Sequence, residues 1–178
     1  MKLIVAVDRN WAIGKDDDFL VKIPEDMKRI RMLTMGNVVI MGRKTLLSLP
    51  DKRPLLNRTN IVLTRNNNLK KEYEKYDNLI VVNSIDELKS VLKVYEDKDI
   101  FVIGGESVYK ELLPMCNEAL VTKIDFSYDA NKYFPNLDKA PDWKITSISE
   151  ENTYYDIIFE YVISVSYTHL TLPTTERV

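Results

Sequence analysis

The sequence is poor in glycine, cysteine and histidine, and each shortage excludes a class of protein. Among its 178 residues are five glycines, one cysteine and one histidine. A single thiol, Cys116, forms neither an internal disulfide nor a zinc cluster, which suits a reducing compartment. The histidine, His169, lies in a threonine-rich C-terminal stretch. The chain before that stretch therefore has no histidine for Ser-His or metal-His chemistry.

Long apolar runs and a strong excess of one charge are also absent. No apolar run reaches the ~20 residues that span a bilayer, and the apolar start of the chain is too short for a signal peptide. The formal net charge is −2, so there is no basic surface of the kind that nucleic-acid binders show. We expect a cytoplasmic, monomeric globular protein with neither a membrane nor a nucleic acid as partner.

Short apolar runs alternate with helical patterns, as in proteins built from β-α-β units. Helices are predicted from Pro24 to just before Gly36, from Ser84, where Ser84 and Glu87 make a capping box, and over 106–113. The predicted strands are 3–7, 38–41, 61–64, 79–82, 100–103, 119–124, 144–149 and 156–163. This pattern predicts one α/β domain with a mainly parallel, twisted central sheet, flanking helices and an antiparallel C-terminal edge.

The C-terminal stretch 165–178 follows the last predicted strand. It is rich in threonine, lacks a helical or strand period, and resembles a translated sequencing adapter. We therefore expect the domain to cover residues 1–164 and the tail 165–178 to be non-native or disordered. A genuine extension of the protein is the alternative.

Glycines and cations follow three of the predicted strands. They are Gly42 with Arg43-Lys44-Thr45, then Arg65, and then Gly104-Gly105 before a helix. Ligands of open α/β sheets bind beyond the carboxyl ends of strands, and such residues suit phosphate groups. Taken singly, each also fits solvated surface charge or a tight turn. There is no G-x-G-x-x-G motif to support a standard dinucleotide fold.

Asp26 is the carboxylate that the helical pattern singles out. At helical spacing it shares a face with Ile30 and Leu33, whereas Glu25 does not. Burial beside an apolar stripe raises the pKa of a carboxyl group, which suits proton chemistry. The alternative is that both acids simply favour the N-terminus of the helix.

Several blocks of sequence, taken together, resemble the dihydrofolate reductase family. They are Ile4-Val5-Ala6, Ile13-Gly14, Ile23-Pro24-Glu25-Asp26-Met27, Val39 to Thr45, Asn57 to Arg65, Ile103-Gly104-Gly105 through Val108-Tyr109, Thr122 and Tyr133-Phe134-Pro135. They occur in the family's order and spacing. The resemblance implies NADPH-dependent reduction of 7,8-dihydrofolate to 5,6,7,8-tetrahydrofolate by hydride transfer to the pterin, in a protein that also binds antifolate inhibitors.

The resemblance also implies roles for residues at matching positions. Asp26 would be the catalytic residue, binding the pterin and assisting its protonation with support from Thr122, and Arg58 would clamp the glutamate carboxylate. The other substrate-binding positions are Val5, Met27, Ile30 and Leu49. The cofactor-binding positions are Ala6, Ile13, Gly14, Gly42, Arg43, Lys44, Thr45, Leu63, Thr64, Arg65, Ile103, Gly104, Gly105, Glu106, Ser107 and Tyr109. The Gly104–Gly105 bond is expected to be cis, and no metal site is expected.

Three places depart from the family's pattern. Leu20-Val21 stands where many members have Pro-Trp, Asn131-Lys132 where Asp-Thr is usual, and Leu56 where proline is frequent. These changes bear on water near the pterin and on loop closure. Two rival functions remain: the related reductase of riboflavin synthesis, which would lack the combination of Asp26 and Arg58, and a non-catalytic nucleotide- or partner-binding protein, against which Asp26 argues. NADPH oxidation with dihydrofolate separates all three.

Overall fold

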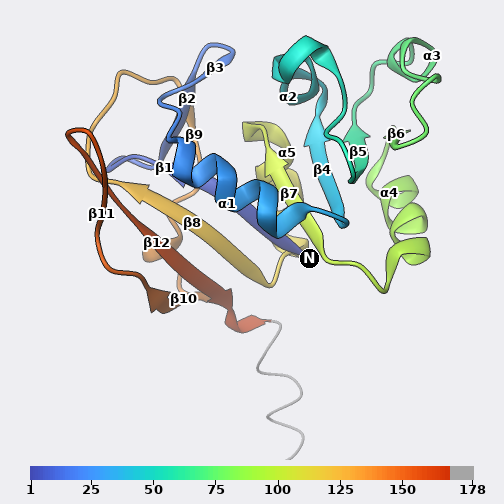
Figure 1. Cartoon of the computed structure of the whole chain (residues 1–178). Helices are drawn as coiled ribbons and strands as arrows, with labels where there is room; N and C mark the ends of the chain where they lie inside the picture. The colour runs from blue at the N-terminus through green and yellow to red at the C-terminus, as the bar shows by residue number, and fades with distance from the viewer. Residues whose placement is uncertain (169–178) are drawn as a thin grey trace, which may run out of the picture.

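The computed structural model describes residues 1–168, which form a nine-stranded sheet, a three-stranded sheet and helices on both faces of the larger sheet (Figure 1). The helices are α1 Pro24–Thr34, α2 Arg43–Ser48, α3 Leu69–Glu72, α4 Ile85–Leu92 and α5 Glu106–Leu112. The strands are β1 Lys2–Val7, β2 Ala12–Lys15, β3 Asp18–Phe19, β4 Val38–Gly42, β5 Thr59–Leu63, β6 Leu79–Val82, β7 Ile100–Gly104, β8 Glu118–Ile124, β9 Lys132–Tyr133, β10 Trp143–Ile148, β11 Asn152–Tyr154 and β12 Ile157–Ser166. None of the described helices is long and apolar enough to cross a membrane.

The large sheet has the strand order β10-β12-β8-β1-β7-β4-β5-β6, with β11 added beside β12. The strands from β8 to β6 in that order are mutually parallel, and β12 turns antiparallel to β8. The central strands are Val- and Ile-rich because both of their faces are covered; Val38 to Met41 are all fully buried. The predicted fold class, with its antiparallel C-terminal edge, is confirmed.

Two helices cover opposite faces of β1. On one face, Ile30 and Leu33 of α1 pack against Ile4. On the other, Val108 and its neighbours on α5 pack in the same cluster as Leu3. Successive side chains of a strand point to opposite faces, so α1 and α5 lie on the two sides of the sheet. Figure 1 shows α1 crossing in front of the strands and α5 behind them.

The helix boundaries follow the predicted signals closely. Pro24 is the first residue of α1, and Gly36 lies just past its end with a positive φ of 76°. At α4 the Ser84 hydroxyl accepts a hydrogen bond from the Glu87 amide at 3.1 Å. The second bond of a capping box would run from the Ser84 amide to the Glu87 carboxylate. Here the Glu87 carboxylate accepts instead from the amide of the preceding residue, Asn83, at 3.1 Å.

The three-stranded sheet, β3-β2-β9, was not predicted from the sequence. Its strands are short and mostly polar, so they show no clear period. Next to it, Asp16 and Asn131 form two hydrogen bonds: the Asp16 amide donates to the Asn131 side chain at 2.8 Å, and the Asn131 amide group donates to the Asp16 carboxylate at 2.9 Å. Asn131, one of the departures from the family's pattern, therefore still ties the loop after β2 to the loop before β9.

The predicted domain boundary after residue 164 is wrong, because it falls inside β12. Val165 pairs with Glu118 of β8 and Lys144 of β10. The Ser166 amide donates to the Asn117 carbonyl at 3.0 Å, and Ser166 is only 3% exposed. β12 extends to Ser166 because its two neighbours, β8 and β10, provide hydrogen-bonding partners up to that residue. The rest of the predicted tail, 169–178, lies outside the described residues.

We predict that a chain truncated after residue 164 is less stable than one truncated after residue 168. The shorter chain loses the bond from Ser166 and the bond from the Tyr167 amide to the Asp142 carbonyl, which is 2.7 Å long. We expect a melting temperature lower by about 5 °C, roughly 1–2 kcal/mol for a domain of this size. Thermal unfolding followed by circular dichroism measures the difference. Equal melting temperatures would show that these last pairs contribute nothing.

Candidate active site

The carboxyl ends of β4, β5 and β7 meet at one edge of the large sheet. Gly42 at the end of β4 pairs with Leu63 of β5, and Met41 pairs with Gly104 of β7. Half of the predicted cofactor residues follow these strand ends directly. They are Arg43, Lys44 and Thr45 in α2, Thr64 and Arg65 after β5, and Gly105, Glu106 and Ser107 at the start of α5. The structure thus brings together groups that lie up to about sixty residues apart in the chain.

Two glycines permit a close approach at this edge. A Cβ atom on Gly42 would lie 3.0 Å from the Val108 side chain, tighter than ordinary packing. Gly104 has a φ of +139°, and a Cβ there would lie 3.4 Å from the Thr45 hydroxyl. The expected cis bond between Gly104 and Gly105 is confirmed. Larger residues would fill the space between the two strand ends.

The cations at this edge differ in whether they form ion pairs. Among residues 1–168, neither Arg43 nor Arg65 takes part in an ion pair, whereas Lys44 lies 3.8 Å from Asp17, with both side chains exposed. An exposed pair at that distance contributes little. The Glu106 carboxylate is already engaged, since it accepts from the Tyr133 amide at 2.6 Å. The edge therefore offers unpaired positive charge to an anion.

Asp26 lies buried at the start of α1, only 6% exposed, as its helical position predicted. The Thr122 hydroxyl of β8 donates a hydrogen bond to its Oδ1 at 2.7 Å. Burial raises the pKa of the Asp26 carboxyl above its ordinary value, and the Thr122 bond and the positive charge of Arg29 oppose that rise. The expected contact between Thr122 and Asp26 is present, and the carboxyl retains a second oxygen for a ligand.

The apolar residues beside Asp26 come from α1 and β1, with one difference from the prediction. Ile30 packs with Ile4, but the Val5 side chain lies on the opposite face of β1. Alternation along the strand is the reason, because neighbouring residues point to opposite faces. Ile4 is thus a β1 side chain on the same face of the sheet as Ile30. Leu49 packs with Ile103 in the adjoining cluster, while Met27 is 51% exposed on α1.

Arg58 is held half-buried near the far end of α1. Its Nη1 donates to the Thr34 hydroxyl at 3.2 Å and its Nε to the Leu56 carbonyl at 3.0 Å. Burial and the neighbouring charge of Arg31 lower the pKa of its guanidinium. No carboxylate in residues 1–168 pairs with it. An oriented guanidinium without a counter-ion is suited to bind a carboxylate ligand.

The remaining predicted cofactor positions lie on β1, β2, the strand ends and α5. Ala6 is the register partner of Thr122, and Ile13 and Gly14 belong to β2. Tyr109 is buried, and its hydroxyl donates to the Ile4 carbonyl at 2.5 Å. That hydroxyl is therefore already used inside the fold, on the sheet face opposite α1.

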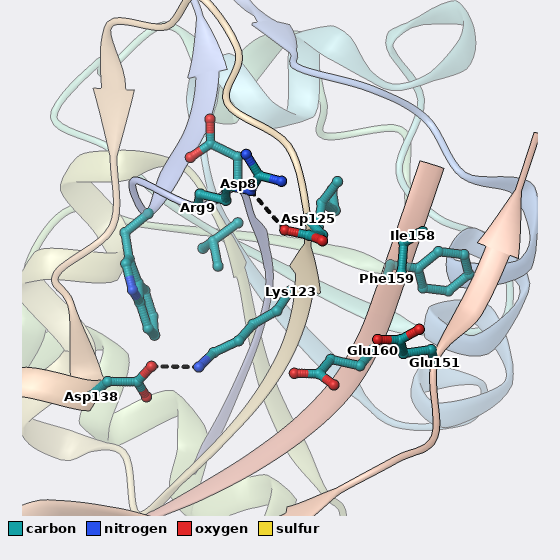
Figure 2. Close-up of a pocket in the computed structure, with 12 residues that line it drawn as sticks. Asp8, Arg9, Lys123, Asp125, Asp138, Glu151, Ile158, Phe159 and Glu160 are labelled. Atoms are coloured by element: carbon teal, nitrogen blue, oxygen red, sulfur yellow. Dashed lines mark hydrogen bonds and ion pairs between the residues drawn. The ribbon is translucent and has the colours of Figure 1, made fainter. Parts of the chain in front are cut away.

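A separate hollow of about 260 Å³ lies beside the ends of β1 and β8 (Figure 2). Five carboxylates and two cations line it: Asp8, Asp125, Asp138, Glu151, Glu160, Arg9 and Lys123. Arg9 pairs with Asp125 at 2.7 Å, and Lys123 pairs with Asp138. The excess of negative charge does not suit phosphates or a glutamate. Nor does any group of His, Cys, Asp and Glu within residues 1–168 have an arrangement that suits a metal ion.

Comparisons with known proteins give one family over almost the whole chain. A family model described as dihydrofolate reductase matches residues 1–165. The chain is 36% identical over 154 residues to a dihydrofolate reductase of Bacillus subtilis (strain 168), covering 86% of this chain and 84% of that protein. It is 34% identical over 166 residues to the enzyme of Staphylococcus haemolyticus, covering 89% and 92%. The Haemophilus influenzae enzyme is 33% identical over 157 residues, covering 85% and 91%.

We predict that Asp26→Asn stabilises the fold at neutral pH. Because burial raises the folded-state pKa of Asp26, its favourable contribution is complete below the unfolded pKa and is lost as the pH rises through the folded one. At pH 7 the ionised carboxyl therefore costs stability. The variant should be more stable than the parent at pH 7 and should lose that gain as the pH falls toward about 4.

Thermal unfolding of both proteins between pH 4 and pH 8 measures this dependence. Glu25→Gln serves as the matched control, since Glu25 is exposed at the neighbouring position of the same helix turn. It should show no comparable gain. A constant difference between Asp26→Asn and the parent at every pH would contradict the reasoning.

Proposed function

Since this chain belongs to the dihydrofolate reductase family, we propose that Asp26 assists proton delivery in its reaction and that the cations at the strand ends hold the cofactor. The enzyme reduces 7,8-dihydrofolate to 5,6,7,8-tetrahydrofolate with NADPH, and antifolates bind it as small-molecule ligands. When bound, NADPH supplies the hydride. The residues of the chain bind and orient the ligands and place the proton.

The strand-end residues fit a phosphate-bearing cofactor. Arg43 and Arg65 have no ion-pair partners in the described part of the chain, and the glycines at 104 and 105 leave room beside the Thr45 hydroxyl. Guanidinium groups make strong charge-assisted bonds to phosphate. Arg43, Lys44, Thr45, Thr64 and Arg65 would hold the phosphates, and the Gly104-Gly105 backbone would lie along them. Ala6, Ile13, Gly14, Gly42, Leu63, Ile103, Glu106, Ser107 and Tyr109 would complete the cofactor-binding region.

The single observation that carries the catalytic proposal is the buried Asp26 carboxyl with one oxygen bonded to Thr122. Its other oxygen would accept hydrogen bonds from the pterin amino group and ring nitrogen. Asp26 would then help to deliver a proton to the imine nitrogen that is reduced. A carboxyl group whose pKa is raised by burial suits this task, because general acid–base catalysis works best when the pKa lies near the working pH.

The proposal also assigns residues to the rings and the glutamate of the substrate. Ile4, Ile30 and Leu49 would line the pterin and benzoyl rings, with Met27 at the exposed margin, and Val5 would contribute only through its backbone. Arg58 would clamp the glutamate carboxylate, since its guanidinium is oriented by Thr34 and lacks a carboxylate partner in residues 1–168. We also infer that the enzyme works as a monomer in the cytoplasm without a nucleic acid; the buried lone thiol of Cys116 and the net charge of −2 support this.

We predict that Asp26→Asn loses most of its turnover at neutral pH while NADPH binding changes little. The amide does not ionise near neutral pH and so neither takes up nor delivers a proton, and positioned acid–base chemistry typically contributes ~10²–10⁴-fold. Steady-state oxidation of NADPH with dihydrofolate and fluorescence titration with NADPH measure the two properties. Glu25→Gln is the control and should stay close to the parent. An Asp26→Asn turnover within threefold of the parent would exclude the proposed role.

We predict that Arg65→Gln weakens NADPH more than NADH. A charge-assisted hydrogen bond contributes ~1.5–3 kcal/mol, so the preference for NADPH in kcat/KM should fall by roughly tenfold or more. The two cofactors are compared at low and high salt, because screening weakens exposed charges. Lys70→Gln on α3, which removes an exposed cation, is the control. An unchanged preference in Arg65→Gln would show that Arg65 is ordinary surface charge.

A further inference from the structure

A second charged side chain, Arg29, lies beside Asp26, and the reaction as described does not use it. Its guanidinium lies over the ring of Tyr161, 4.1 Å from the ring centre. The Arg29 Nη1 atom and the Tyr161 hydroxyl are both buried and have no hydrogen-bond partner within residues 1–168. A buried donor without a partner is costly, most of all when it is charged. Such a group needs compensation from its surroundings.

The backbone holds Arg29 and Asp26 together through a closed set of four side chains. Residues three apart on a helix are neighbours, which places Arg29 next to Asp26 on α1. Thr122 of β8 donates to Asp26, and Tyr161 of β12 is the register partner of Thr122. Directly opposed residues on adjacent strands share a face. We call Asp26, Thr122, Tyr161 and Arg29 the carboxylate frame.

Besides Arg29, one acid and two phenols lie near Asp26. Glu25 is its exposed neighbour on α1, and Tyr109 of α5 and Tyr161 of β12 carry phenols. Burial raises the pKa of both phenols, and the charge of Asp26 raises them further, so both stay neutral at physiological pH. Among the described residues, Arg29 is therefore the cation of this group.

The compensation for Arg29 has two sources inside the frame. The face of the Tyr161 ring attracts the guanidinium, as aromatic rings do for cations. No carboxylate in residues 1–168 lies within ion-pair distance of Arg29, but Arg29 interacts with the charge of Asp26 over a longer distance. The reverse follows as well: the cation favours the charged form of Asp26 against the effect of burial.

We propose that Arg29, held over the ring of Tyr161, is a positioning residue that keeps Asp26 as a carboxylate before the substrate binds. The consequence for the enzyme rests on the proposed role of Asp26. Only the carboxylate has free acceptor sites for both donor groups of the pterin, whereas a protonated acid gives up one of them. Arg29 thus sets the fraction of enzyme that is ready to bind dihydrofolate at a given pH.

The direct test is a titration of the Asp26 side chain by carbon-13 NMR in the full-length protein without ligand. The Asp26→Asn variant identifies the resonance by its absence. Arg29→Gln and Arg29→Met remove the charge and should move the midpoint to higher pH, whereas Arg29→Lys retains it and should restore the midpoint of the parent. Tyr161→Leu should move it in the same direction as Arg29→Gln, and Tyr161→Phe, which keeps the ring, should not.

A midpoint in folded Arg29→Gln or Arg29→Met equal to that of the parent would overturn the proposal. So would a shift in Arg29→Lys as large as in Arg29→Gln, because the effect would then come from packing and not from charge. Backbone amide spectra establish that each variant is folded, and two charge-removing variants guard against one that is not.

A kinetic measurement connects the frame to substrate binding. In Arg29→Gln the KM for dihydrofolate should rise at least threefold at pH 6 and much less at pH 8, while NADPH affinity stays within about twofold. The two proposals fail separately. If the parent enzyme does not oxidise NADPH with dihydrofolate, or Asp26→Asn retains turnover, the proposed function fails while the titration still tests Arg29. If Asp26→Asn is inactive and the titration does not move, Arg29 has no such role.

Discussion

The hydrogen bond between Thr122 and Asp26 joins two elements that are 96 residues apart, and the arrangement of the candidate site depends on it. It fixes the first turn of α1 against β8, and the apolar stripe of α1 then follows along β1 through Ile30 and Leu33. The bond also gives a hydrogen-bond partner to one oxygen of a carboxyl group that is buried away from water. Removing a charged group from water is expensive unless it is bonded or paired. Thr122 and Arg29 are the two groups that reduce that cost here.

The burial of Asp26 has opposite effects on the stability of the fold and on proton transfer. A carboxyl group whose charged form is disfavoured by its surroundings weakens the fold at neutral pH, yet it is suited to moving protons there. The sheet accommodates such a residue because its core is large and lies elsewhere, in the clusters around Val38 and Ile40 on one side and Val39 and Met41 on the other. The site thus lies at the margin of the core, where one helix turn and one strand end meet.

Charge is distributed unevenly between the edge where β4, β5 and β7 end and the hollow beside β1 and β8. Guanidiniums without an ion-pair partner in residues 1–168 follow β4 and β5, whereas the hollow beside β1 and β8 carries mostly carboxylates, with its two cations paired (Figure 2). Phosphates and a glutamate tail are both anionic, so the field favours the first region. The chemistry of the side chains therefore favours the strand-end edge as the candidate site for anionic ligands.

Local signals in the sequence were sufficient for the long regular elements. Proline at the start of α1, glycine after its end and Ser84 before α4 act through hydrogen bonds within a few residues, and the apolar strands of the parallel sheet are buried on both faces. Local signals did not predict the three-stranded sheet, whose short polar strands have no period, nor the last residues of β12. That strand extends to Ser166 because β8 and β10 are there to pair with it.

The sequence by itself determined the α/β class and the ends of α1, α4 and α5, because those depend on local propensity and on periods of two and 3.6 residues. Most of the candidate site residues came instead from the resemblance to the family. Tertiary structure decided which residues share a face and which charges meet. Only the register of β1 shows that Ile4, and not Val5, packs with Ile30, and only the pairing of β8 with β12 brings Tyr161 beneath Arg29. Register is a long-range property, since it depends on strands far apart in the chain, and no local pattern carries it.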